Sequence, residues 1–336
     1  MKFLLFVMCV GAAVYFFCFR NSSDTSPAPK AAAAAPKTAA AAPKAAAPEP
    51  AKAPEKSKEE SQAAAVKAKF SADAKYKKDS LGARLAEFHN APEFLFDPSR
   101  KIKIPRTPVN VIRQELKRYP QALKNARDLQ KYADLGVEEV YIFSGLKHVG
   151  TVQTAVRVLA CSGIVNASER NNKQAVEDFN AAGKILNVFL AGSHCFPEMF
   201  ICKFYTQVLC NAVNHSRLPA KSKQAILRKL PQKKDWAAAF PRLVECDKNF
   251  SLQTKTFIDA GGEMKLLGID AAKLELLKQV SRAHWEEVLN KSQEFILNEW
   301  KKGTLSKDTK INVGTEQENI LLQETFVVQG YIRFLK

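Results

Sequence analysis

The sequence predicts an all-α fold: a helical array of antiparallel hairpins that follows a single N-terminal transmembrane helix and a disordered linker. Residues 3–19 are an uninterrupted apolar run, residues 21–78 are rich in Ala, Pro and Lys, and residues 79–336 carry apolar side chains at helical spacing. The chain has 336 residues, of which 46% are hydrophobic. Residues 79–336 are therefore numerous enough to bury a substantial core without disulfides or metals.

Residues 3–19 contain no charged side chain, and Arg20 ends the run. A helix of this length covers about 25 Å, the short end of what a bilayer core requires. A cleavable signal peptide is the alternative, since a short basic start and an apolar stretch fit both. The bulky exit from Tyr15 to Phe19 is typical of a membrane interface and lacks the small residues that cleavage needs. These features favour an uncleaved transmembrane signal anchor.

Residues 27–54 alternate Ala runs with Pro-Lys pairs, a composition that favours extended, polyproline-like geometry with a reach of about 90 Å. The Lys and Arg residues that flank the anchor are almost balanced, but the linker resembles the envelope-spanning linkers of bacterial anchored proteins. We therefore expect a single-pass inner (cytoplasmic) membrane protein with a periplasmic, extracytoplasmic helical domain. Residues 21–66 have few large apolar side chains, so deletion of residues 1–75 is expected to leave that domain folded.

Apolar side chains at intervals of three and four predict helices throughout the domain. In the longest, Asp270 is the expected N-cap, and Gly303 stands where the helix should end. Val137–Phe143 is the one convincing strand-like run, and it is too isolated to build a sheet. The predicted helices are 79–89, 109–118, 120–134, 148–168, 172–191, 196–215, 219–230, 233–258, 270–301 and 316–335.

Two consecutive helices, 148–168 and 172–191, predict a closely packed hairpin. Gly163 lies on the first helix, and Ala175 and Phe179 follow on the second. The small residues permit a close approach, and Phe179 fills the groove between the helices. The spacing resembles one tetratricopeptide-type hairpin. A solenoid needs three or more such repeats, so the hairpin is one unit of a larger helical array.

The order of segments over residues 110–336 resembles an uncharacterised bacterial family of signal-anchored, all-helical proteins. The segments that carry the resemblance are LKNARDL, DLGVEE, RVLACSGIVNAS, NNKQAVEDFNAAGKIL, LPAKSKQAILRKL and AHWEEVL. That family has a recurring layout and no diagnostic catalytic motif. The resemblance therefore implies fold and topology rather than an activity.

The net charge of +17 divides into +2 for residues 1–20, +4 for residues 21–80 and +11 for residues 81–336. The excess in the domain predicts attraction to anionic surfaces, either lipid headgroups, nucleic acid or an acidic envelope polymer. Nucleic acid is the least supported, since no recognition motif is present. Basic runs such as Lys221–Lys223 and Lys233–Lys234 are interpreted as solvated helix ends or loops.

Five cysteines lie outside the membrane segment: Cys161, Cys195, Cys202, Cys210 and Cys246. An odd number cannot form a complete disulfide framework, so we interpret them as buried free thiols. Pro197 is expected to start a helix and to leave His194 and Cys195 in the preceding turn. A thiol nucleophile paired with His194 is the alternative interpretation, and loop and core packing is the favoured one.

The remaining candidate chemistry is weak. His284, Trp285, Glu286 and Glu287 suggest a core Trp flanked by solvated charges, and Gly261-Gly262 lacks the preceding strand of a phosphate-binding loop. No catalytic, cofactor-binding or metal-ligating residue is predicted, and no cofactor. The leading hypothesis is a membrane-tethered extracytoplasmic scaffold that binds a protein partner in the cell envelope. The alternatives are a binder of an acidic envelope polymer and an enzyme with an unrecognised helical site.

Overall fold

In a computed structural model, the chain forms two units, Met1–Ala65 and Val66–Lys336. The predicted membrane segment and most of the predicted linker lie outside the described residues. Within the described residues, no helix combines the length and the apolar character needed to cross a membrane. The structure describes residues 64–66, 68–70, 72–89, 102–104, 106–141, 146–261, 271–306 and 309–325.

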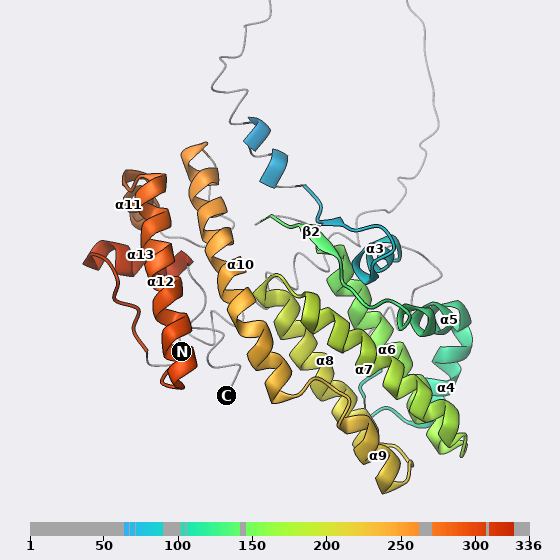
Figure 1. Cartoon of the computed structure of the whole chain (residues 1–336). Coiled ribbons are helices and arrows are strands. Elements are labelled where there is room, and N and C mark those ends of the chain that lie inside the picture. Colours follow the sequence, from blue (N-terminus) through green and yellow to red (C-terminus); the bar gives the residue numbers. More distant parts are fainter. Residues whose placement is uncertain are drawn as a thin grey trace, which may run out of the picture. The chain divides into compact units, whose positions relative to one another are not determined.

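The described residues are mostly helical, which confirms the predicted fold class at this level (Figure 1). Two short strands, β1 (Lys75–Tyr76) and β2 (Val137–Glu139), accompany the helices. The helices are α3 (Leu81–Glu87), α4 (Val109–Arg118), α5 (Pro120–Leu129), α6 (Lys147–Ser168), α7 (Asn172–Gly192), α8 (Phe196–His215), α9 (Ala220–Leu227), α10 (Lys233–Asp259), α11 (Ala271–Gln279), α12 (Arg282–Lys302) and α13 (Glu316–Thr325).

Helix α6 is the centre of the core, because α3, α4, α5, α7 and α8 all pack against it. Most of its residues are buried, as expected for a helix that is apolar around much of its circumference. The predicted hairpin of α6 and α7 is confirmed. A Cβ at Gly163 would lie 2.7 Å from the Phe179 ring, so only glycine admits the ring at this crossing.

A buried carboxylate also joins α5, α6 and α7. Asp178 on α7 is 1% exposed and forms a bidentate ion pair with Arg127 on α5, at 2.8 and 3.0 Å. It also accepts hydrogen bonds from Ser162 at 2.7 Å and from Asn166 at 3.1 Å, both on α6. With the Gln174 amide, which donates at 3.1 Å, five donor groups satisfy a charge that would otherwise be costly to bury.

Helices α10 and α12 run side by side and carry the C-terminal part of the core (Figure 1). Trp285 on α12 is completely buried, and the rings of Phe240 on α10 and Trp300 on α12 lie 4.3 Å apart. Aromatic side chains bury large areas, so these rings stabilise the pairing of the two helices. The predicted end of α12 is confirmed, since Gly303 has a φ of 72° and caps the helix.

The prediction of a single helix over 270–301 is wrong. α11 ends at Gln279, and α12 begins at Arg282. Ser281 between them has an extended backbone, and its hydroxyl accepts from the backbone N–H of His284 at 3.2 Å. A serine that caps a new helix competes with continuation of the old one, and periodicity alone does not reveal that choice. The expected cap Asp270 lies outside the described residues.

The helix predicted over 120–134 is too long, because α5 ends at Leu129. The next residues form a loop that is hydrogen-bonded to the start of α3. The carbonyl oxygens of Asp134 and Leu135 accept from the backbone N–H groups of Leu81 and Gly82, at 2.9 and 2.8 Å. Gly136 follows with a φ of 66°, a left-handed conformation that ends any helix.

The expectation that the strand-like run at Val137 builds no sheet is also wrong. β2 pairs in antiparallel fashion with β1, whose two residues the sequence analysis assigned to the linker. A strand of two residues has no readable period, and its partner lies some sixty residues away. Phe70 and Ala74 near β1 are buried as well, so the folded unit begins well before residue 79.

Candidate functional site

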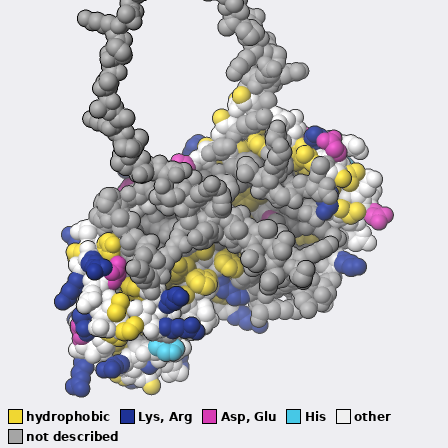
Figure 2. All heavy atoms as spheres, turned by 180° about the vertical axis from the view of Figure 1, so that it is seen from behind, with side chains coloured by type: hydrophobic (Ala, Val, Ile, Leu, Met, Phe, Trp, Pro, Cys, Tyr) yellow, Lys and Arg dark blue, Asp and Glu magenta, His cyan; other side chains and the backbone are white. Residues whose placement is uncertain are grey.

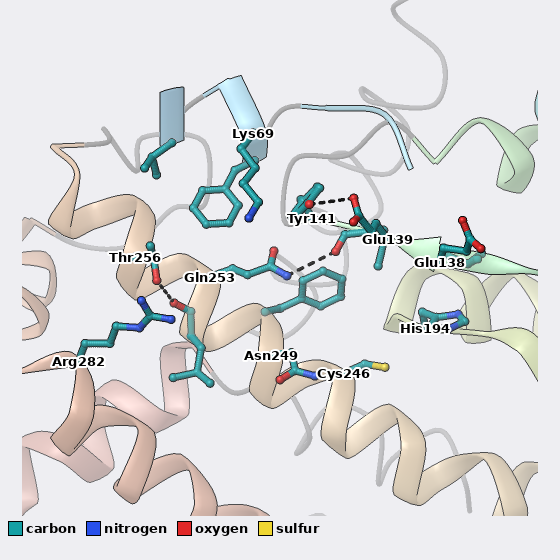
Figure 3. A pocket seen from close by; sticks show the side chains of 16 residues that line it. Lys69, Glu138, Glu139, Tyr141, His194, Cys246, Asn249, Gln253, Thr256 and Arg282 are labelled. Atoms are coloured by element: carbon teal, nitrogen blue, oxygen red, sulfur yellow. Dashed lines mark hydrogen bonds between the residues drawn. The ribbon is translucent and has the colours of Figure 1, made fainter. Parts of the chain in front are cut away.

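A groove of about 580 Å³ lies between β2 and α10 (Figure 3). One wall is the continuous segment from Val137 to Tyr141, and the opposite wall is a single face of α10. The N-terminal segment that contains Val66 and Phe70 closes part of it, and Arg282 from the start of α12 also lines it. Both apolar and polar side chains line the walls, as in clefts that hold peptides or small ligands.

The α10 wall presents its side chains at helical spacing. Cys246, Asn249, Gln253 and Thr256 line the groove from α10, and Gln253 reaches towards the strand in Figure 3. The Gln253 amide reaches across the groove and donates to the carbonyl oxygen of Val140 at 3.4 Å, near the long limit for a hydrogen bond. The Gln253 side chain therefore forms only a weak hydrogen bond with the Val140 carbonyl oxygen. In a larger sheet, a backbone N–H of a neighbouring strand would donate to that oxygen.

The β2 wall is an edge of the small sheet. Among the described residues, β1 is its only neighbour, and the register shifts so that Tyr76 opposes Val137 while Lys75 opposes Glu139. Glu138 is thus an extra residue, a β-bulge of the kind that often marks a binding edge. Glu139 pairs with Lys75 at 2.7 Å and accepts from the Tyr141 hydroxyl at 3.0 Å, which anchors the wall.

Opposite ends of the groove differ in chemistry (Figure 3). Lys69 lies 5.7 Å from the centre of the Tyr141 ring, and Arg282 lies across from it at the same end. Arg282 takes part in none of the described ion pairs. His194 and Cys246 lie at the other end, where the Nδ1 atom of His194 is buried and has no hydrogen-bond partner within the described residues. A bound group could satisfy that atom.

Next to His194, a chain of hydrogen bonds crosses the core. The Tyr76 hydroxyl lies 2.6 Å from Nδ1 of His148, and Nε2 of His148 lies 2.6 Å from Oε1 of Glu198. His148 and Glu198 are completely buried. The other carboxylate oxygen accepts from the backbone N–H groups of His194 and of Cys195, the latter at 3.1 Å.

One protonation pattern satisfies every group of this chain. In this pattern Tyr76 donates to Nδ1 of His148, and Nε2–H of His148 donates to the ionised Glu198. Burial alone would raise the pKa of Glu198, but the hydrogen bond from His148 and the backbone N–H of His194 hold it below its usual value. Burial and the charge of Glu198 raise the pKa of Tyr76. The carboxylate also caps the N-terminus of α8, where the helix dipole favours negative charge.

The thiols of this region are poor nucleophiles. Burial, followed by the charge of Glu198, raises the pKa of Cys246 to about 11 and that of Cys195 well above its usual value. Cys195 faces the core as the N-cap of α8, and the His194 ring lines the groove, so the two side chains do not act as a pair. The favoured loop-and-core interpretation holds here.

All five cysteines of the folded unit are free, in agreement with the prediction. Cys161, Cys195 and Cys202 are buried, as expected, whereas Cys210 and Cys246 are only half-buried. Burial raises the pKa of Cys202 and of Cys210 as well.

The His284 cluster is structural. Trp285 belongs to the core, while His284 contacts Glu318 at the start of α13 and Glu287 pairs with Lys291 at 2.7 Å. Of the pair Gly261-Gly262, only Gly261 is described. It lies in the turn that follows α10 and has a φ of 72°. Within the described residues, no three His, Cys, Asp or Glu side chains gather in a way that could hold a metal ion.

The sequence analysis singled out neither the groove nor the buried chain. Tyr76 and His148 lie 72 residues apart in the sequence, and His148 and Glu198 lie 50 apart. None of the three belongs to a recognisable motif in its own segment. One local signal was available: Glu198 stands three residues after Cys195 with Pro197 between them, the pattern of a helix start.

No known protein family, no curated protein and no solved structure matches the chain.

Proposed function

We propose that this chain is a membrane-tethered, extracytoplasmic protein-interaction module that binds an extended segment of a partner protein in the groove between β2 and α10. The observation that carries the proposal is the edge of β2, which lines a groove of about 580 Å³ opposite α10. An extended peptide can add to such an edge through main-chain hydrogen bonds and place alternate side chains in the groove.

The contacts across the groove fit this mode of binding. The bond from Gln253 to Val140, at 3.4 Å, is weak enough for an incoming backbone N–H to replace. Phe70 and Phe250 line the groove and offer apolar surface to the side chains of a peptide, and Arg282 offers a positive charge near one end. The enzyme hypothesis is less supported, because the thiols have raised pKa values and the buried carboxylate is fully hydrogen-bonded.

Site-specific photocrosslinking tests the groove. A photoreactive residue at Asn249, which is exposed on the α10 wall, is expected to form a defined adduct with one envelope protein. The same residue at Gln114, exposed on α4, serves as the matched control and should form no such adduct. A synthetic peptide that covers the crosslinked segment of the partner should then compete for the adduct.

Hydrogen exchange tests the binding mode with that peptide. The backbone N–H groups of residues 137–141 are expected to exchange more slowly in the complex, because an added strand protects them. Equal crosslinking at Asn249 and Gln114, or a peptide that binds without protecting residues 137–141, would contradict strand addition.

The compartment is a separate prediction, which rests on the apolar run at residues 3–19 and on the linker. A reporter that is active only in the periplasm, fused after Lys336, is expected to be active. A reporter that fluoresces only in the cytoplasm should stay dark at the same position. The reverse pattern would place the domain in the cytoplasm and would remove envelope proteins as partners.

A further inference from the structure

The residues from Asn214 to Arg242, here named the basic lobe, concentrate positive charge. They run from the end of α8 through α9 into the start of α10 and contain eight Lys or Arg residues against one acid, Asp235. This stretch contributes +7 of the +11 carried by residues 81–336. Lys and Arg side chains crowd the end of the molecule that holds α9 in Figure 2.

The basic side chains of the lobe have no acidic partners among the described ion pairs. Twelve Lys or Arg side chains elsewhere in the described residues form ion pairs with carboxylates. None of the described ion pairs involves a basic side chain of the lobe. The one acid, Asp235, accepts from the backbone N–H of Gln232 at 2.8 Å and caps α10. The lobe therefore keeps its positive potential.

A concave site of about 530 Å³ lies within the lobe, between the C-terminal part of α7 and the start of α10. Arg242 on its wall is already engaged, because it donates to the carbonyl oxygens of Leu190 and Ser193, both at 2.9 Å. Arg228, Lys229 and Lys234 also line the site, and all three are exposed. Three exposed cations thus line one cavity, and its one carboxylate, Asp235, caps α10.

The distribution of charge favours a long ligand over a compact one. Arg217, Lys221 and Lys233 extend the positive surface beyond the cavity, farther than a single anionic group can neutralise. The lobe offers no exposed Phe, Tyr or Trp ring for stacking bases, since Phe240 is buried and Trp236 half-buried, and its one exposed ring is that of His215. The large exposed apolar side chains of the described residues, Val111, Phe204 and Ile320, all lie outside the lobe, so it has no apolar wedge for a bilayer.

We infer that the basic lobe binds a linear polyanion other than nucleic acid, with one of its anionic groups held among Arg228, Lys229 and Lys234. The site is independent of the groove beside β2. Binding would follow from charge complementarity and release of counterions, so its affinity should fall steeply with salt concentration.

Long-chain inorganic polyphosphate is the probe, tested on the full chain in non-ionic detergent. The variant R228E/K229E/K234E is expected to bind at least about ten-fold more weakly than the wild type, with a smaller dependence on salt. The matched variant K117E/K124E/K131E makes the same change of charge at three exposed lysines on and near α4 and α5. It should stay within about three-fold of the wild type.

All six substituted side chains are exposed, so unfolding does not explain a loss of binding; far-UV circular dichroism checks this. Equal losses in the two variants would overturn the inference, because overall charge would then account for binding. Binding to vesicles of anionic lipid or to single-stranded DNA without binding to polyphosphate would also overturn it. Binding that does not change between low and high salt would exclude a polyanion site.

Discussion

A chain that starts at Asp79 is expected to be at least about 4 kcal/mol less stable to unfolding than a chain that starts at Val66. The shorter chain lacks Phe70, which is 6% exposed and packs its ring 5.9 Å from that of Tyr141 and 6.3 Å from that of Phe257. Loss of a buried Phe side chain alone costs about 3–5 kcal/mol.

The shorter chain also loses β1 and the Tyr76 hydroxyl, which leaves Nδ1 of the buried His148 without its donor. Urea unfolding followed by circular dichroism measures the difference. The chain that starts at Val66 is the control and should unfold cooperatively. Equal stability of the two chains would show that residues 66–78 contribute nothing to the fold. Deletion of residues 1–75, which is expected to leave the domain folded, also removes Phe70 and should lower its stability.

Replacement of Glu198 with Ala is expected to lower the free energy of unfolding by about 3–5 kcal/mol. Three donors lose their acceptor in the core: Nε2–H of His148 and the backbone N–H groups of His194 and Cys195. Each buried donor left unpaired is costly, and α8 also loses its cap. Glu286→Ala on the exposed face of α12 is the control and should change stability by less than about 0.5 kcal/mol.

Glu198→Gln separates shape from charge. The Gln amide can donate to Nε2 and accept from the two backbone groups, provided that His148 takes the other tautomer and donates to the Tyr76 oxygen. Glu198→Gln should therefore lower the free energy of unfolding by less than Glu198→Ala does. If the two variants lost the same stability, the hydrogen bonds of the chain would not be what holds this region together.

The pH dependence follows from the depressed pKa of Glu198. The stability that the ionised carboxylate contributes is fully present above the unfolded-state pKa of about 4.5 and is lost as the pH falls through the lower folded-state pKa. The advantage of the wild type over Glu198→Gln should shrink below pH 4.5 and stay constant from there towards neutral pH. If the advantage of the wild type grew on acidification, the folded-state pKa of Glu198 would be raised and not lowered.

The basic lobe shows how much of a candidate site a sequence can reveal. Its charge was visible in runs such as Lys221–Lys223, which the sequence analysis interpreted as solvated helix ends. Composition cannot say whether a lysine is paired across the fold. The tertiary structure decides that, because each ion pair depends on a carboxylate brought near from another turn or another element.

By itself, the sequence determined most of the helices and the close crossing of α6 and α7. Periodic apolar side chains specify helices locally, Gly303 ends α12, and Gly163 beside Phe179 sets the approach of α6 and α7. The tertiary structure alone decided that Lys75–Tyr76 is a strand, that β2 pairs with it and has no second partner among the described residues, and that His148 meets Glu198. The physical reason is range: helical patterns repeat every few residues, whereas these contacts join segments 50 or more residues apart and leave no local trace.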